Sequence, residues 1–140
     1  GAAGDAPRRQ RRPPELDGGP LVAFKKLIQR IKASDADLDR ERLRQFCSDL
    51  PGVTAIGGAA PRQEVTVAGE ITSLRIVPRA GTPWLEATVN DGSGSLVVVW
   101  SGRRHIPGVA PGKRLVLSGR GAPQGPGGRL TVLNPRYELL

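Results

Sequence analysis

The sequence predicts a mainly β domain, a small barrel of five antiparallel strands preceded by a helical appendage. Two apolar strands in residues 84–100 flank a tight turn at residues 91–94 (DGSG), where aspartate supports its own backbone and glycine accepts a positive φ. Short runs with period-two alternation recur along residues 63–140, separated by Gly- and Pro-rich segments, as is typical of an all-β barrel. No helical pattern interrupts them to provide a parallel crossover, so we expect antiparallel pairing.

Length, charge and cysteine content narrow the class of protein. The chain has 140 residues, enough for one domain with appendages. Its 21 basic and 13 acidic side chains give a formal net charge of +8, which favours nucleic acid, or less often an anionic membrane surface, over a protein that is merely basic. The single Cys47 excludes an internal disulfide, and no apolar run reaches the ~18 residues that span a bilayer. We therefore expect a cytoplasmic protein with no membrane partner.

The N-terminal part divides into a tail and two short helices. Residues 1–19 are dominated by Gly, Ala, Pro and charged residues, so we expect a disordered basic tail. Residues 20–52 are predicted to form the helices. In the first helix, at residues 20–33, apolar residues recur at spacings of three and four: Leu21, Phe24, Ile28 and Ile31. Such a stripe usually packs on its own domain, while a partner groove or a membrane surface is the alternative.

The second helix is predicted to begin at Ser34, a capping residue followed by carboxylates in the first turn. It runs to about Leu50 and ends at the Pro-Gly pair of residues 51–52,. Cys47 lies on its apolar stripe, so we interpret it as a small buried hydrophobic residue. Two short helices of this kind form a hairpin that either covers a barrel end or pairs with another copy of the chain.

Residues 63–140 provide the strands of the barrel. Residues 63–78 form the first strand, and Gly69 lies near a change in its alternation, which indicates a bulge or a sharp bend. After the central hairpin, residues 113–120 form the fourth strand. Residues 129–140 form the fifth, and the Asn134-Pro135 pair near its end suits an edge position,.

Five strands, a bend in the first, and a loop between the third and fourth are the layout of an OB-fold. Within this layout the sequence resembles small actinobacterial OB-fold nucleic-acid-binding proteins, and more loosely the OB wedge domain of RecG-type helicases and the anticodon-binding OB module of tRNA synthetases. The resemblance covers roughly residues 30–140. The motifs that carry it are residues 91–100 (DGSGSLVVVW), 102–108 (GRRHIPG), 111–114 (PGKR), 119–120 (GR) and 134–138 (NPRYE).

The resemblance implies binding of single-stranded nucleic acid, and we expect DNA in preference to RNA. The helicase motor and the synthetase catalytic domain are absent from this sequence, so none of their activity is expected. OB-folds bind single strands across the second and third strands. The outward parity there includes Trp84 and Thr88 on the second strand and Val97 and Val99 on the third. Trp84 is the best stacking candidate, its alternative role being a cap on the barrel rim. Trp100, on the inward parity, is predicted to be core.

The remaining aromatic residue in this region, Tyr137, is predicted to close the barrel against the first strand, and stacking on a base is the alternative. Phosphate contacts are assigned to basic residues that have few carboxylates nearby. Together they predict salt-sensitive and sequence-tolerant binding. These residues are Arg75, Arg79, Arg103, Arg104, Lys113, Arg114, Arg120, Arg129 and Arg136.

Catalysis finds little support in the sequence. His105 is the only histidine and lies in a Gly/Pro-rich loop, and Cys47 belongs to a distant helix. The chain therefore has no Cys/His nucleophilic pair and no zinc-ligand spacing. We expect no enzymatic activity, no metal and no cofactor. The rival hypothesis is a protein interaction module that uses the Val97/Val99 face or the N-terminal helices, because OB-folds host many functions. A homo-oligomer through those helices belongs to the same hypothesis.

Overall fold

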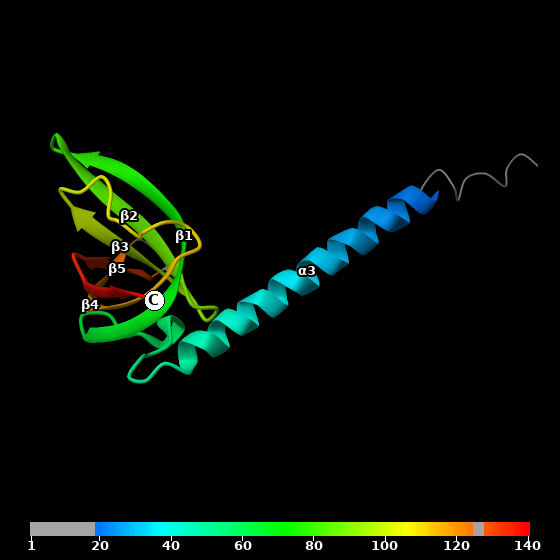
Figure 1. Cartoon of the computed structure of the whole chain (residues 1–140), viewed down its shortest axis with the longest axis horizontal. Helices are drawn as coiled ribbons and strands as arrows, with labels where there is room; N and C mark the ends of the chain where they lie inside the picture. The colour runs from blue at the N-terminus through cyan, green and yellow to red at the C-terminus, as the bar shows by residue number, and fades with distance from the viewer. Residues whose placement is uncertain (1–18, 125–127) are drawn as a thin grey trace, which may run out of the picture. The chain divides into compact units, whose positions relative to one another are not determined.

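The computed structural model describes residues 19–124 and 128–140 and divides the chain into two units, Gly1–Asp39 and Arg40–Leu140. Except for Gly19, the predicted tail at residues 1–19 lies outside the described residues. No helix within residues 19–124 and 128–140 combines the length and apolar character that crossing a membrane requires. The elements are drawn in Figure 1.

The prediction of two short helices is wrong, because residues 20–48 belong to one continuous helix, α3 (Gly19–Ser48). Ser34 was expected to cap a new helix, yet serine and aspartate cost only tenths of a kcal/mol inside a helix, up to about 0.7. No Gly or Pro occurs between residues 21 and 48 to end the first helix, and these are the residues that stop a helix. The chain leaves the helix just before the Pro-Gly pair at 51–52, as predicted.

The second unit contains six strands, and five of them close into a ring. The ring order is β1-β2-β3-β5-β4, and β4 pairs back with β1. The mainly β, OB-type barrel predicted from the sequence is therefore confirmed. The elements of this unit after α3 are η2 (Ile56–Gly58), β1 (Glu64–Arg79), β2 (Thr82–Asn90), β3 (Ser95–Ser101), β4 (Arg114–Gln124), β5 (Arg129–Leu133) and β6 (Arg136–Leu139).

Two details of the strand prediction are wrong. The predicted fifth strand is two strands, because Asn134 turns the backbone with a φ of 47° and Pro135 has no N–H to continue a ladder. As a result β5 pairs with β3 and the end of β4, whereas β6 pairs only with β4. The pairing is also not wholly antiparallel, since β3 and β5 run parallel. They can do so because the long loop after β3 and the whole of β4 separate them in sequence.

The bend in β1 is present, but its irregularity lies a few residues beyond Gly69. The register between β1 and β2 shifts between Ile71 and Ser73. Residues 64–70 pair with β4, and residues 70–79 pair with β2, so the bend lets one strand serve two neighbours. Gly69 has a separate reason for being glycine: a Cβ there would lie 2.8 Å from the carbonyl oxygen of Asn90.

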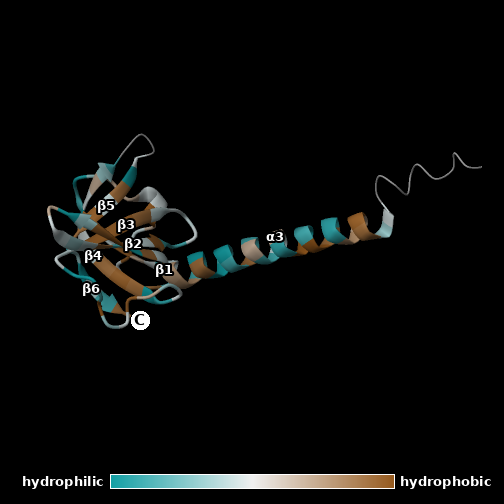
Figure 2. Cartoon of the chain, turned by 90° about the horizontal axis from the view of Figure 1, so that it is seen from above, coloured by the Kyte–Doolittle hydropathy of each residue, from teal (hydrophilic) through white to brown (hydrophobic). Residues whose placement is uncertain are grey.

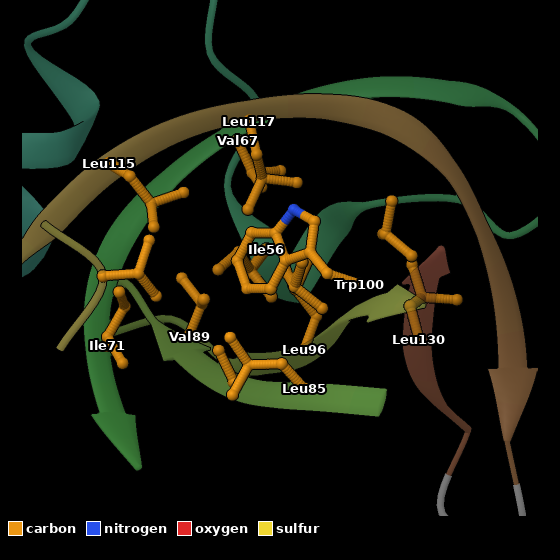
Figure 3. Packing of buried hydrophobic residues seen from close by; sticks show 14 of the residues in the cluster. Ile56, Val67, Ile71, Leu85, Val89, Leu96, Trp100, Leu115, Leu117 and Leu130 are labelled. Carbon is orange, nitrogen blue, oxygen red and sulfur yellow. The ribbon is translucent and has the colours of Figure 1, made fainter. Parts of the chain in front are cut away.

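The core fills the barrel with side chains from every strand of the ring. Figure 3 shows the indole of Trp100 among Val67, Leu85, Leu96 and Leu117. Trp100 is only 4% exposed, which confirms it as a core residue, and its Nε1 has no hydrogen-bond partner among the described residues. Figure 2 shows apolar residues, in brown, along the strands of the barrel.

Tyr137 packs edge-to-face on Trp100, with ring centroids 5.6 Å apart. It lies on β6 opposite Leu117 of β4, so the prediction that it closes the barrel against the first strand is wrong. The split at residues 134–135 gives the reason, because β6 pairs with β4 instead of returning to β1.

A second, smaller apolar cluster anchors the end of α3 within the Arg40–Leu140 unit. Leu43 and Cys47 pack on Ala68 of β1, so the interpretation of Cys47 as a buried hydrophobic residue is confirmed. Burial raises the pKa of the Cys47 thiol, and the charge of Asp91 adds to the rise.

Asp91 is itself buried and organises the β2–β3 turn. It accepts hydrogen bonds from the backbone N–H groups of Ile56, Ser93 and Gly94 and from the hydroxyl of Ser93. The turn predicted at residues 91–94 therefore also holds the start of η2.

Candidate functional site

The outer face of the barrel carries two adjoining hollows that together form what we call the outer groove. The larger has a volume of about 410 Å³, and the smaller, of about 300 Å³, shares several of its residues. The lining side chains come from β1, β2, β3, β4 and β5, so the groove crosses the sheet. They are Arg75, Arg79, Trp84, Glu86, Val97, Val99, Ala122, Gln124, Arg129, Thr131 and Leu133.

Strand alternation explains how β2 and β3 supply the centre of this groove. On β2 the inward residues Leu85, Ala87 and Val89 are almost completely buried, which turns Trp84 and Glu86 outward. In the β2–β3 register Glu86 lies opposite Val99. Val99 is only 3% exposed despite its outward parity, so it forms the floor of the groove rather than an accessible contact.

Two arginines contact Glu86, the one carboxylate among the described residues that line the outer groove. Nε of Arg75 donates a hydrogen bond to Oε1 of Glu86 at 3.0 Å. A terminal nitrogen of Arg79 lies 3.7 Å from Oε2 of Glu86, and its guanidinium carbon lies 4.7 Å from the centre of the Trp84 ring. The side chain of Arg129 forms no salt bridge with the described residues. Three cations therefore face one anion, and the lining is positive overall.

The structure brings six of the thirteen predicted site residues to this groove: Arg75, Arg79, Trp84, Val97, Val99 and Arg129. Arg136 is engaged elsewhere, in an ion pair with Glu64. Arg103 and Arg104 lie in the loop between β3 and β4, Lys113 immediately precedes β4, and Thr88 lies on β2 opposite Val97. None of these is among the described lining residues, and their contact with a ligand stays a prediction.

Two further predicted arginines are engaged elsewhere in the Arg40–Leu140 unit. Arg114 pairs with Glu70 at 3.2 Å, and its guanidinium carbon lies 4.6 Å from the centre of the Phe46 ring. Arg120 donates a hydrogen bond to the backbone carbonyl of Arg62 at 3.2 Å. Both are therefore held away from the outer groove.

Sequence reasoning did not find Gln124, Thr131 and Leu133. The parallel pairing of β5 with β3 places Thr131 beside Val97 and Leu133 beside Val99. Alternation with the buried Leu130 and Val132 was the available signal that these two residues face outward. What the sequence did not show is which strand lies next to β3.

Another hollow, of about 320 Å³, lies beside the end of α3 and is lined by Cys47, Ala68 and Asp91 among others. The Asp91 carboxylate already accepts backbone and hydroxyl hydrogen bonds, and the Cys47 thiol is buried. Among the described residues, no group of three or more His, Cys, Asp and Glu side chains is placed to hold a metal ion. The outer groove is therefore the candidate site.

Comparison with known proteins gives the following matches. The family model described as "OB-fold nucleic acid binding domain" matches residues 65–140. Among solved structures, RecG bound to a three-way DNA junction matches with a TM-score of 0.52 and 19% identity over 63% of this chain. A replication factor A related protein from Methanobacterium thermoautotrophicum matches with a TM-score of 0.48 and 18% identity, over 63% of this chain and 90% of its own. The search of curated proteins gave no match.

The match to RecG covers only 12% of the RecG chain. At 19% identity this match supports only the similarity of fold, and only for the part of RecG that it covers.

Proposed function

Because the chain belongs to the family of OB-fold nucleic acid binding domains, we propose that it binds single-stranded nucleic acid along the outer groove. The observation that carries this proposal is the convergence of Arg75, Arg79 and Arg129 with Trp84 on one hollow across β2 and β3. OB-folds bind oligonucleotides on this face, between the β1–β2 and β4–β5 loops. Arg79 ends β1, and Gln124 and Arg129 flank the β4–β5 loop, so both margins of the groove are polar or cationic.

The chemistry of the groove suits a single strand in two ways. Guanidinium groups hold phosphate oxygens bidentately, and the surplus of arginine over carboxylate gives a sequence-independent attraction. Trp84 offers an aromatic face for a base. Arg79 braces that ring and presents its own planar guanidinium, which can also stack on a base.

DNA is the proposed ligand in preference to RNA. The support is the similarity of fold to RecG, whose solved structure is bound to a three-way DNA junction. Equal or tighter binding of an oligoribonucleotide of the same sequence would contradict this part of the proposal.

Fluorescence anisotropy with a labelled single-stranded oligonucleotide at low and high salt tests the groove. Arg129→Ala is expected to weaken binding and to reduce the slope of log K against log salt by about 0.7, the value for one phosphate contact to a single strand. Arg120→Ala is the matched control, since it removes the same charge from a side chain bonded to the carbonyl of Arg62. Equal effects of the two substitutions would show that net charge alone attracts the strand. If the protein does not bind the oligonucleotide even at low salt, the proposed function is wrong.

We also propose that the chain is a binding module rather than an enzyme. The family description names binding and no reaction. The only carboxylate described in the groove lies between two arginines, an arrangement that suits electrostatic pairing better than proton transfer.

Protein docking is the second candidate function, and the exposed apolar side chains of α3 favour it. Leu21 is 66% exposed and Phe24 58%. Pull-down from cell extract with and without nuclease separates the two candidates. A partner that is retained after nuclease treatment supports docking, whereas one that nuclease releases was held by nucleic acid.

A further inference from the structure

The Glu86 carboxylate has one oxygen without a hydrogen bond. Oε1 accepts from Nε of Arg75 at 3.0 Å. Oε2 lies 3.7 Å from the nearest nitrogen of Arg79, which is an ionic contact but too long for a hydrogen bond. Among the described residues no other donor reaches Oε2. The side chain is 12% exposed and lines the groove.

The arginines of the outer groove determine how a bound strand lies. Arg75 and Arg79 beside Glu86, and Arg129 on β5, attract phosphates,. With the sugar–phosphate chain held by these side chains, the bases turn towards the floor, where Val97, Val99 and Glu86 lie. Trp84, two residues before Glu86 on the same face of β2, supports the plane of a base whose edge then reaches the carboxylate.

An ionised carboxylate only accepts hydrogen bonds. It can accept a hydrogen bond from the exocyclic N4 amino group of cytosine, as acidic side chains do in base recognition. Thymine presents a carbonyl oxygen, O4, at the same position, and two acceptors facing each other repel. Cytosine and thymine are otherwise close in size and stacking area, and strands of the two carry the same phosphate charge.

We propose that Glu86 makes the outer groove selective for bases with an exocyclic amino group, so that cytosine is bound in preference to thymine. The inference rests on the proposed function and deepens it, because it names the base chemistry that the groove accepts. It also changes the expectation of sequence-tolerant binding: phosphate attraction is sequence-independent, and Glu86 adds a base-dependent contribution.

Anisotropy titrations with oligodeoxycytidylate and oligodeoxythymidylate of equal length test the inference. The unsubstituted protein is expected to bind the cytosine strand on the order of tenfold more tightly, as befits a hydrogen bond to a charged group. Glu86→Gln keeps the size of the side chain but can donate as well as accept, so the preference should disappear. Binding of the thymine strand should become tighter, because a negative charge has left the groove.

Glu64→Gln is the matched control, because Glu64 pairs with Arg136 on β6 instead of facing the groove. It should leave the cytosine preference intact. Equal affinity of the unsubstituted protein for both strands overturns the inference but leaves the proposed function standing. Loss of all binding in Glu86→Gln, with an unchanged unfolding temperature, also overturns it, since Glu86 would then act only by positioning Arg75 and Arg79. Failure of the unsubstituted protein to bind either strand counts against the proposed function itself.

Discussion

Trp84 is the only aromatic side chain among the described residues that line the outer groove, and Arg79 covers part of its ring. Its environment is mixed, because the cationic Arg79 and the exposed, apolar Leu133 line the same hollow. A single ring gives little stacking surface compared with a platform of several aromatics. Charge is therefore expected to supply most of the affinity, and Trp84 a contribution that salt does not screen.

Trp84→Ala is expected to weaken binding of a single strand by about 1–3 kcal/mol, the range for one base stacked on an aromatic ring. The loss should be the same at low and at high salt, because stacking is not screened by ions. Anisotropy titrations at two salt concentrations measure it. Trp84→Phe retains a ring and should recover most of the affinity. A loss that vanishes at high salt would instead mean that Trp84 acts by positioning Arg79.

At the scale of the element, β1 is the strand on which the closure of the barrel depends. Its first half pairs with β4 and its second half with β2. The two halves can diverge because the register shifts between Ile71 and Ser73 and because β2 approaches closely at Gly69. Arg75 and Arg79 lie beyond the shift, in the half of β1 that pairs with β2, so the bend places them at the outer groove.

Gly69→Ala is expected to destabilise the fold by about 1–3 kcal/mol, the usual cost of overpacking. The new Cβ would lie 2.6 Å from a methyl carbon of Val89 and 2.8 Å from the carbonyl oxygen of Asn90, and backbone cannot move aside. Urea unfolding measures the change. Gly58→Ala is the control, because a Cβ at Gly58 meets nothing within 4 Å. If both substitutions cost the same, the close approach of β2 is not the reason for glycine at position 69.

For the whole molecule, the continuous α3 raises the question of what its exposed apolar residues contact. Phe24 and Ile31 are 58% and 47% exposed and lie seven residues apart, which keeps them on one face of a helix. The self-association proposed from the sequence requires this face. Its packing on the chain's own barrel is the alternative prediction.

If α3 pairs with a second copy, light scattering should give a mass above the 14.8 kDa of one chain that rises with protein concentration. Phe24→Gln combined with Ile31→Gln should restore the mass of one chain, because the apolar contact is lost. Lys26→Gln combined with Arg30→Gln changes another face of the helix and serves as the control. A mass of one chain at every concentration would contradict self-association. A lower unfolding temperature in the first double variant would indicate packing on the chain itself.

The sequence by itself determined the class of the barrel, the turn at residues 91–94 and the inward and outward residues of β2 and β3. These properties are local: alternation and turn chemistry act between residues that are neighbours in the chain. It also placed Trp100 in the core and Trp84 outside. The continuity of α3 was missed because a capping residue is a preference that a helix can override, whereas the absence of Gly and Pro leaves nothing to stop it.

Only the tertiary structure decided which of the predicted arginines share a surface. Arg79 and Arg129 are fifty residues apart in sequence yet line one hollow, whereas Arg114 and Arg120 turn to Glu70 and to the carbonyl of Arg62. Barrel closure and the parallel β3–β5 pairing produce that selection. Both are strand pairings between residues far apart in the sequence, and no local pattern specifies which strands pair. The set of residues that lines the groove could therefore be identified only from the tertiary structure.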